Sequence, residues 1–533
     1  MKITISLLSV LFFSFSFSLN ANSTDFRVTP GPEMLIKIDI TNKFDIEFLN
    51  SNRVCLISDL DDLVLARCDR KSVEFLKESG LNYSILDSDV SNRNYYYVWT
   101  LDNESERAIS LFGKILFKKR DFLIVRLDDV SKLKQLMQFR VEITRISLNP
   151  IQINTKITEF PIIYHNPTIQ EIVDRVSSDS VLGFVRRLSN FRTRYSSTDS
   201  CRAAADYIKF RFEAYGLDSI YFQEFDSIYA PNVIGIKRGI LYPDSIYTIL
   251  CGHFDCTSQN PDNFAPGADD NGSGATAVLE AVRVTQGYNF EYSIRFIAFS
   301  GEEQGLLGSN FYANQANNRN DSILGVINVD MVAYSLPNRD SASIIGTPSN
   351  PNCEPLVDYF IACADTYTLL HTQRQIIDRP RSDHASFNQY GFVAIHCREN
   401  LNIANPYYHT TGDSIGGGFN SLNLCTEVIE ATVATVTSLA IPTAIGINET
   451  KMNQFTLRII PNPTSKLIRI EYIPCSVKIE IAIFNITGRV RKRLTTIENS
   501  NSVNIDVSSL KSGVYFVELK NNSNRLNNKL VIR

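Results

Sequence analysis

The most constraining feature of this chain is a set of histidines and carboxylates spread over its middle third, each inside a short motif. The set comprises His253 in Gly-His-Phe-Asp, Asp270 in Ala-Asp-Asp-Asn-Gly, Glu302 and Glu303 after Ser-Gly, Asp330 in Asn-Val-Asp-Met, and His409 in Tyr-Tyr-His-Thr-Thr-Gly-Asp. Two imidazoles and three carboxylates can bind a pair of zinc ions when one carboxylate bridges them, which leaves one carboxylate free to transfer a proton. The set therefore predicts a hydrolase that uses two metal ions.

The length and charge of the chain indicate how many domains it has and which partners are not expected. A chain of 533 residues is too long for one ordinary domain, and its 44% hydrophobic residues suffice for a large core, so two or three domains are expected. The formal net charge is -4 and charges of both signs are mixed along the chain, which leaves no extended basic surface for phosphates. Nucleic acid is therefore not an expected partner.

The first residues have the pattern of a secretory signal peptide. One lysine precedes an apolar, phenylalanine-rich run from Ile3 to Leu19, and the small residue Ala21 follows shortly after. Residues 1–21 are therefore expected to be removed on export, and no integral membrane segment is expected in the mature protein. The ten cysteines could then form disulfides, although their pairing does not follow from the sequence.

Residues 22–160 hold no cluster of metal-ligand residues but show a faint internal duplication. The strand-helix-strand pattern of residues 63–86 is repeated in residues 122–143. Two small β-α-β units, together a small α+β domain, fit this pattern. A propeptide with an inhibitory or chaperone-like role and an accessory folded domain explain the region equally well.

Between residues 166 and 441, helical and strand patterns alternate, which predicts an α/β layer fold with a mixed, mainly parallel sheet. Buried strands are expected at residues 247–250, 293–299 and 324–329, and each runs directly into one of the motifs above. Open α/β sheets bind their ligands beyond the carboxyl ends of the strands, so the candidate residues should converge there.

The end of the chain differs in character from its middle. A linker is expected at residues 442–453, and residues 454–533 contain short alternating strands separated by turn residues. This pattern predicts a small β-sandwich. No candidate catalytic residue lies in this part of the sequence.

Each candidate histidine has an aspartate nearby that could orient it. Asp255 is two residues after His253, so at a strand end both side chains would point to the same face, and Asp255 could accept the imidazole N–H. Asp413 lies close enough to His409 for the same task.

The carboxylates divide into metal ligands and a base. Adjacent carboxylates at a strand-to-helix turn suit both tasks, and we assign Glu303 to metal and Glu302 to proton transfer. A helix capping box would explain Glu303 but not Glu302. Asp330 ends an apolar strand, where an ionised carboxylate requires a metal or a cationic neighbour. The phenol of Tyr408 could donate to a developing oxyanion, and ordinary packing of its ring is an equal alternative.

Together these motifs resemble one family, the secreted co-catalytic di-zinc aminopeptidases related to bacterial leucyl aminopeptidase and, more distantly, to glutamate carboxypeptidase. The resemblance covers about residues 166–441 and includes Ser382, Asp383 and His384, which would lie at the substrate pocket. It implies a three-layer α/β/α domain of the phosphorylase/hydrolase type, in addition to the small N-terminal domain and the C-terminal β-sandwich that the patterns above predict.

The resemblance also implies a ligand set for two zinc ions. Asp270 would bridge the two ions. His253 and Asp330 would complete one site, and Glu303 and His409 would complete the other.

The tail resembles the C-terminal sorting domain of cargo for the type IX, or Por, secretion system of certain Gram-negative bacteria. The matching segments are residues 461–465, 483–489, 510–516 and 529–533. This resemblance implies export through the periplasm and across the outer membrane, with the type IX machinery as a partner. The expected location is secreted or on the cell surface.

The expected activity is that of a zinc aminopeptidase, an exopeptidase that hydrolyses N-terminal peptide bonds through a water activated by two metals, with Glu302 as the general base. Two alternatives remain: a glutaminyl cyclase, which shares the scaffold but binds one zinc, and a surface binding module without turnover. The preferred side chain does not follow from the sequence, nor does the choice among aminopeptidase, carboxypeptidase and dipeptidase activity.

Overall fold

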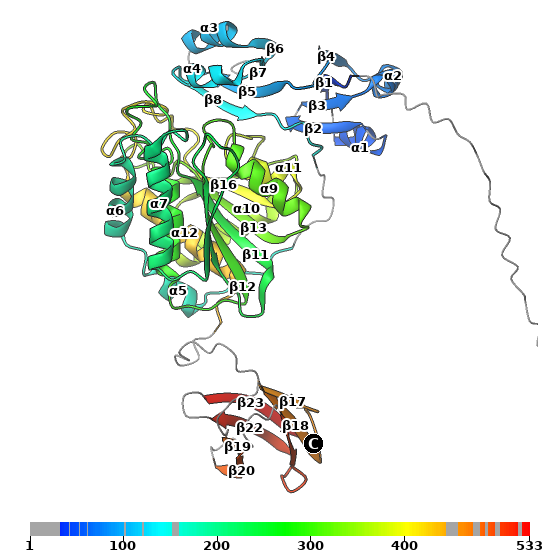
Figure 1. The fold of residues 1–533 in the computed structure, drawn as a ribbon, viewed down its shortest axis with the longest axis vertical. Coiled ribbons are helices and arrows are strands. Elements are labelled where there is room, and N and C mark those ends of the chain that lie inside the picture. The colour runs from blue at the N-terminus through cyan, green and yellow to red at the C-terminus, as the bar shows by residue number, and fades with distance from the viewer. Residues whose placement is uncertain are drawn as a thin grey trace, which may run out of the picture. The chain divides into compact units, whose positions relative to one another are not determined.

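A computed structural model shows two compact units, residues 1–443 and residues 444–533 (Figure 1). It describes residues 32–41, 43–52, 54–60, 62–100, 103–119, 122–151, 159–443, 457–472, 480–485, 489–495, 502–520 and 525–533. The expected signal peptide and most of the expected linker lie outside these residues. Within them, no helix is both long and apolar enough to cross a membrane. Nine cysteines of the described part carry free thiols, eight of them buried.

The N-terminal part of the first unit consists of two similar repeats, each with one antiparallel sheet and the helices that connect its strands. The first contains β1 (Met34–Asp39), α1 (Lys43–Ser51), β2 (Cys55–Leu60), β3 (Leu63–Cys68), α2 (Arg70–Ser79) and β4 (Tyr83–Asp87). The second contains β5 (Asn94–Thr100), α3 (Asn103–Phe112), β6 (Lys114–Lys119), β7 (Phe122–Leu127), η1 (Val130–Lys132), α4 (Leu133–Leu136) and β8 (Val141–Arg145). The strand orders, β2-β3-β1-β4 and β6-β7-β5-β8, are equivalent. The repeat is therefore a β-α-β-β-α-β unit, larger than the β-α-β unit expected from the sequence.

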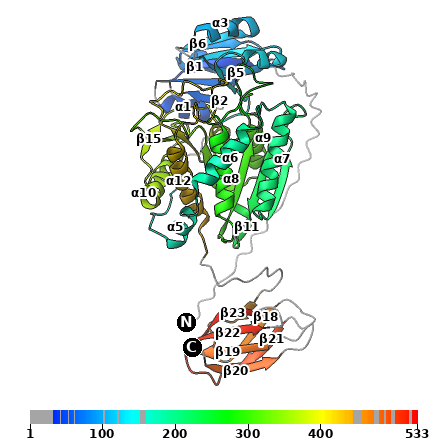
Figure 2. The same cartoon turned by 90° about the vertical axis from the view of Figure 1, so that its left-hand side faces the viewer.

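Strand β8 is an edge strand of its sheet and lies on the side that faces the following domain (Figure 1), and Figure 2 shows the N-terminal sheets next to that domain in a second view. The Thr144 hydroxyl donates to the Pro380 carbonyl at 2.9 Å, and the Arg145 N–H donates to the Gly305 carbonyl at 3.4 Å. Gly305 has φ +104°, and a Cβ there would lie 2.7 Å from the Arg145 nitrogen. Edge strands carry unpaired backbone groups, and here those groups are used to dock one domain on another.

The second part of the first unit is built on one mixed sheet of eight strands, in the order β15-β14-β16-β13-β11-β12-β10-β9. The strands are β9 (Ser219–Gln223), β10 (Asn232–Lys237), β11 (Tyr242–His253), β12 (Tyr292–Phe299), β13 (Ser322–Val329), β14 (Ala342–Gly346), β15 (Thr372–Ile376) and β16 (Ala394–Glu399). The four central strands are parallel to one another, whereas β10 and β14 run antiparallel to their central neighbours. This confirms the mixed α/β fold predicted from the alternating pattern.

Helices bury apolar side chains on both faces of this sheet. They are α5 (Pro167–Val173), α6 (Ser178–Ser189), α7 (Asp199–Ala214), α8 (Gly272–Val284), α9 (Leu307–Asn318), α10 (Cys353–Tyr367), α11 (His384–Gln389) and α12 (Leu422–Ala440). Leu250 of β11 belongs to the hydrophobic cluster that includes α8, α10 and α12, whereas its neighbour Ile249 belongs to the cluster that includes α9 and α11. Side chains alternate along a strand, so a strand buried on both sides is apolar throughout.

The second unit is rich in strands, as predicted. Its strands are β17 (Leu457–Ile460), β18 (Leu467–Tyr472), β19 (Glu480–Asn485), β20 (Val490–Thr495), β21 (Ser502–Asp506), β22 (Gly513–Lys520) and β23 (Arg525–Ile532). They form a three-stranded sheet, β17-β18-β21, and a four-stranded sheet, β20-β19-β22-β23. Ile468 of the first and Val517 of the second share one hydrophobic core.

Candidate metal centre

The candidate residues converge at the carboxyl ends of the parallel central strands. His253 ends β11, Asp330 follows β13, Glu302 and Glu303 lie between β12 and α9, Asp270 precedes α8, and His409 lies between β16 and α12. All six line one small cavity. The crossover topology therefore brings together residues that are more than 150 positions apart in the sequence.

The turn that carries Asp270 depends on small residues. The Asn271 side chain accepts the Gly274 N–H at 2.8 Å and thereby caps α8. A Cβ on Gly274 would lie 2.1 Å from the Val329 carbonyl, so only glycine allows the helix to begin this close to β13. Asp270 is consequently held beside the end of that strand.

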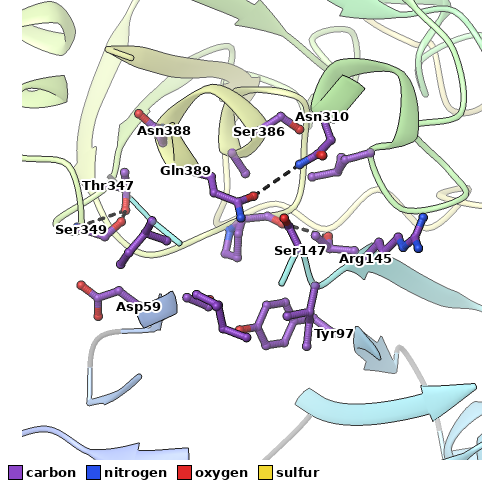
Figure 3. A pocket seen from close by; sticks show the side chains of 18 of the residues that line it. Asp59, Tyr97, Arg145, Ser147, Asn310, Thr347, Ser349, Ser386, Asn388 and Gln389 are labelled. Atoms are coloured by element: carbon purple, nitrogen blue, oxygen red, sulfur yellow. Dashed lines mark hydrogen bonds between the residues drawn. The ribbon is translucent and has the colours of Figure 1, made fainter. Parts of the chain in front are cut away.

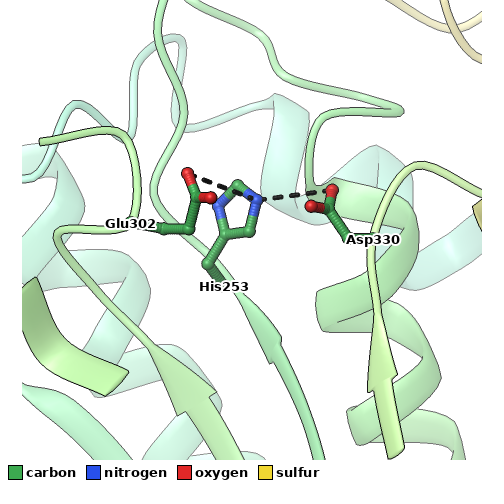
Figure 4. Close-up of side chains that lie close together, drawn as sticks. All are labelled: His253, Glu302 and Asp330. Carbon is green, nitrogen blue, oxygen red and sulfur yellow. Dashed lines mark ion pairs between the residues drawn. The ribbon is translucent and has the colours of Figure 1, made fainter. Parts of the chain in front are cut away.

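The first half of the centre is grouped around His253 (Figure 4). Its Nε2 lies 3.5 Å from Oδ1 of Asp330 and 3.5 Å from Oδ1 of Asp270. Glu302 is slightly farther away, with Oε2 at 4.0 Å. Three carboxylates thus face the same imidazole nitrogen.

The second half is grouped around His409. Its Nε2 lies 3.0 Å from Oε2 of Glu303 and 3.2 Å from Oδ2 of Asp270. The two oxygens of Asp270 therefore face different imidazoles. His409 and Met331 both have a left-handed backbone, with φ 55° and 53°, which is uncommon for these residue types and recurs at functional sites.

The donor atoms and their burial fit zinc. Asp270 Oδ2, Glu303 Oε1 and Asp330 Oδ1 are buried oxygens without a hydrogen-bond donor among the described residues. Ligand atoms of His253, Glu302 and Asp330 lie within 4.8 Å of one another, as do those of His253, Asp270 and Glu303. Buried carboxylates need a compensating charge, and imidazole nitrogen with carboxylate oxygen is a donor set typical of zinc.

Electrostatics separate the two glutamates from Asp330. Burial raises the pKa of Glu302 well above its usual value, and burial raises the pKa of Glu303 to about 7. Burial would also raise the pKa of Asp330, but His253 outweighs it and holds that pKa well below its usual range. A carboxyl group with a raised pKa suits a residue that accepts and returns a proton.

The carboxylates of the two aspartates expected to orient the histidines accept backbone N–H groups. The Asp255 carboxylate accepts the N–H groups of Glu302 and Glu303, both at 3.3 Å, and lies 3.6 Å from His253 Nδ1. The Asp413 carboxylate accepts the N–H groups of residues 269 and 270 at 3.0 and 2.9 Å. Each aspartate therefore supports a turn that carries candidate ligands.

The imidazole Nδ1 atoms have backbone partners. His253 Nδ1 lies 3.1 Å from the Asp255 carbonyl, and His409 Nδ1 lies 2.8 Å from the Val141 carbonyl of β8. Hydrogen bonds of this kind fix the tautomer and direct Nε2 at a metal.

Of the remaining predicted residues, Tyr408 and His384 each line a cavity. The Tyr408 ring lines the metal-site cavity and stacks on the His409 ring, with the two ring centroids 3.9 Å apart. Ser382, Asp383 and His384 are buried and are not among the residues that line this cavity. His384 lines a second cavity, where the N-terminal sheets meet the large domain (Figure 3). The role of Ser382, Asp383 and His384 in the substrate pocket stays a prediction.

Sequence reasoning missed five residues that line the metal-site cavity: Glu142, Ile143, Met331, Arg381 and Arg398. The Arg-Pro-Arg segment directly before the Ser382 motif was an available signal for Arg381. Glu142 had no such signal, because it lies in a strand whose sequence resembles any half-buried strand.

Comparison with known proteins identifies two parts of the chain. Residues 232–431 match Peptidase family M28, and residues 458–533 match the secretion system C-terminal sorting domain. The chain thus carries a domain that matches Peptidase family M28. Its sorting domain marks it for the cell surface or the outside of the cell.

Two relatives of the M28 domain carry the names of peptidases. A probable zinc metalloprotease of Pyrenophora teres f. teres (strain 0-1) is 32% identical over 192 residues, which cover 31% of this chain and 41% of that protein. A probable leucine aminopeptidase of Arthroderma benhamiae is 27% identical over 269 residues, which cover 47% of this chain and 71% of that protein. The chain thus spans less than half of the first relative.

The crystal structure of the Legionella pneumophila LapA aminopeptidase aligns with a TM-score of 0.54 and 21% identity, over 65% of this chain and 98% of that one. This likeness supports the fold of the M28 part.

Proposed function

We propose that the M28 domain is a zinc aminopeptidase that hydrolyses the N-terminal peptide bond of peptides or proteins. The observation that carries the proposal is the convergence of two imidazoles and four carboxylates on one buried cavity. The relatives named as leucine aminopeptidase and zinc metalloprotease support the same activity.

In this proposal, His253 and Asp330 would hold one zinc ion, Glu303 and His409 would hold the other, and Asp270 would contribute to both sites. Zinc bound there would polarise the substrate carbonyl and lower the pKa of a water. A three-layer α/β/α arrangement of the domain belongs to the same proposal.

Glu302 is assigned to proton transfer because it lines the cavity but lies farther from His253 than Asp270 and Asp330 do. It would accept the proton of the attacking water and deliver it to the leaving amine. Tyr408 could donate a hydrogen bond to the developing oxyanion.

The N-terminal domain is proposed to be an inhibitory propeptide. Glu142 and Ile143 of β8 line the metal-site cavity, where a substrate would have to lie. The sorting domain supports handling of the chain by the type IX secretion machinery, and the proposed order is export, passage across the outer membrane and then removal of these segments.

The proposal is tested with Glu302→Ala, using the exposed Glu224→Ala as a matched control. We expect Glu302→Ala to keep both zinc ions and to lower kcat by about 100- to 10,000-fold, because general-base catalysis contributes this much. Zinc content is measured by metal analysis, and released amino acids are identified by mass on peptides with free and with acetylated N-termini.

Activity on free but not on acetylated N-termini supports an aminopeptidase. Release of C-terminal residues, formation of pyroglutamate with one zinc per chain, or near wild-type turnover of Glu302→Ala would contradict the assignment.

A further inference from the structure

Three arginines gather beside the metal-site cavity and share one carboxylate. Arg381 and Arg398 line the cavity together with Glu142. The pKa of Glu142 is held below its usual value, because the charges of Arg381, Arg379 and Arg398 outweigh the effect of burial. The carboxylate belongs to β8 of the N-terminal domain, whereas all three arginines belong to the M28 domain or its flanking loops.

The contact between Arg381 and Glu142 is a two-pronged ion pair. Arg381 donates through Nε to one oxygen of Glu142 and through Nη2 to the other. The side chains are 14% and 9% exposed, so both charges lie largely out of water. The guanidinium also lies over the Trp99 ring, 5.0 Å from its centroid. This geometry is that of a carboxylate receptor, since a guanidinium fork matches both oxygens of a carboxylate.

The other two arginines of the cluster are compensated by negative charge to different degrees. Burial, together with the neighbouring Arg381 and Arg398, lowers the pKa of Arg379 to about 9, and its Nε is buried without a hydrogen-bond acceptor among the described residues. Arg398 faces Glu399 and Asp330, and Asp330 is itself a candidate metal ligand. If the N-terminal domain left, Arg381 would lose its carboxylate and remain a poorly solvated charge.

We propose that Arg381, supported by Arg379 and Arg398, is a carboxylate-binding subsite of the M28 domain, and that Glu142 occupies it in place of a substrate carboxylate. As a statement about substrates, this rests on the proposed peptidase function. The carboxylate has two possible sources: the side chain of an acidic residue, or the α-carboxylate of a peptide short enough to reach from the metal centre.

The test uses the zinc-loaded full chain with Glu142→Gln, because a neutral amide cannot replace the carboxylate at a guanidinium fork. Calorimetry compares L-glutamate with L-glutamine, and Leu-Gly with Leu-glycinamide. Within each pair only one carboxylate differs, so contacts of the amino group with the metal centre cancel. We expect the member with the additional carboxylate to bind about tenfold tighter or more in the pair that represents the true source.

Arg381→Gln, added to Glu142→Gln, should bring that ratio close to one. The matched control is Arg374→Gln, because Arg374 is an exposed arginine that pairs with Glu354 and Asp358 and should leave the ratio unchanged. Arg381→Lys should recover only part of the preference, since lysine has no fork.

The binding ratio does not depend on turnover, so the two proposals fail separately. If neither pair shows a preference, or if Arg381→Gln leaves the preference intact, the subsite is wrong even when the enzyme cleaves peptides. If the preference is present but no peptide is cleaved, the subsite stands and the aminopeptidase function fails.

Discussion

The two candidate histidines are held in different ways. His253 Nδ1 faces the carbonyl of Asp255, two residues along the same loop, at 3.1 Å. His409 Nδ1 faces the carbonyl of Val141, from the N-terminal domain, at 2.8 Å. One half of the centre is therefore complete within the M28 domain, whereas the other depends on β8 for the orientation of its imidazole. Loss of the N-terminal domain should change the two halves unequally.

The largest effect should follow from removal of either imidazole. His253→Ala and His409→Ala should each lower zinc content and reduce kcat/KM by about 1,000-fold or more, because a metal ion supplies several kcal/mol of transition-state stabilisation. Metal analysis and initial rates measure both changes.

The exposed His371→Ala is the control and should behave as wild type. If one histidine variant kept two zinc ions, that imidazole would not be a ligand, and the two halves of the centre would not be equivalent metal sites.

Next in size is the effect of the buried aspartates that support the ligand turns. Asp255→Asn should lower kcat through Glu302, whose N–H it accepts, and Asp413→Asn should weaken zinc binding through Asp270. Changes behind metal ligands reduce metal affinity or activity by about 10- to 100-fold. Zinc titrations together with kcat distinguish the two variants. Unchanged zinc affinity in Asp413→Asn would show that this carboxylate does not position Asp270.

The sequence predicted much of this site because each element carries a local signal. β11, β12 and β13 are apolar strands that run into His253, Glu302 and Asp330, and parallel strands bring their carboxyl ends together. The α/β class of the M28 part and the strand-rich tail followed from the same patterns. The convergence of these residues needed no information beyond periodicity and motif.

The contribution of the N-terminal domain could not be predicted in this way. Glu142 contacts Arg381 across 239 positions, and His409 contacts Val141 across 268. Strand alternation shows that the Glu142 side chain points away from one face of its sheet. It does not show which surface lies opposite that face. Asp255 and Asp413 show the same limit, because proximity in sequence suggested the imidazoles as partners, but the backbone N–H groups that both carboxylates also accept come from segments distant in the sequence.

A smaller effect concerns pH and the docking of β8. The pKa of Glu142 is below its usual value near 4.5. The contribution of this carboxylate to the docking of β8 is therefore complete above pH 4.5 and is lost as the pH falls through the lowered pKa. Trp99 is the single tryptophan and lies against Arg381, so its fluorescence reports this contact. We expect an acid transition in Trp99 emission below about pH 4.5.

Arg379, Arg398 and Tyr408 also face Glu142, and the metal ligands titrate nearby. Glu142→Gln isolates the contribution of the one carboxyl group, because this variant should lack the Trp99 transition and keep any other. An identical transition in both proteins would assign it to a different group.

The smallest effect tests whether docking of β8 is spread over its length or concentrated at Glu142. The Thr144 hydroxyl donates to the Pro380 carbonyl at 2.9 Å and is buried, so Thr144→Val keeps the shape and leaves that carbonyl unpaired, at a cost of about 1 kcal/mol. The urea midpoint followed through Trp99 should fall accordingly, whereas Ser110→Ala, which removes an exposed hydroxyl within α3, should leave it unchanged. A Thr144→Val midpoint equal to wild type would mean that the Thr144 hydroxyl does not contribute to docking, and that β8 and the half of the centre around His409 rest on its other contacts, at Val141, Glu142 and Arg145.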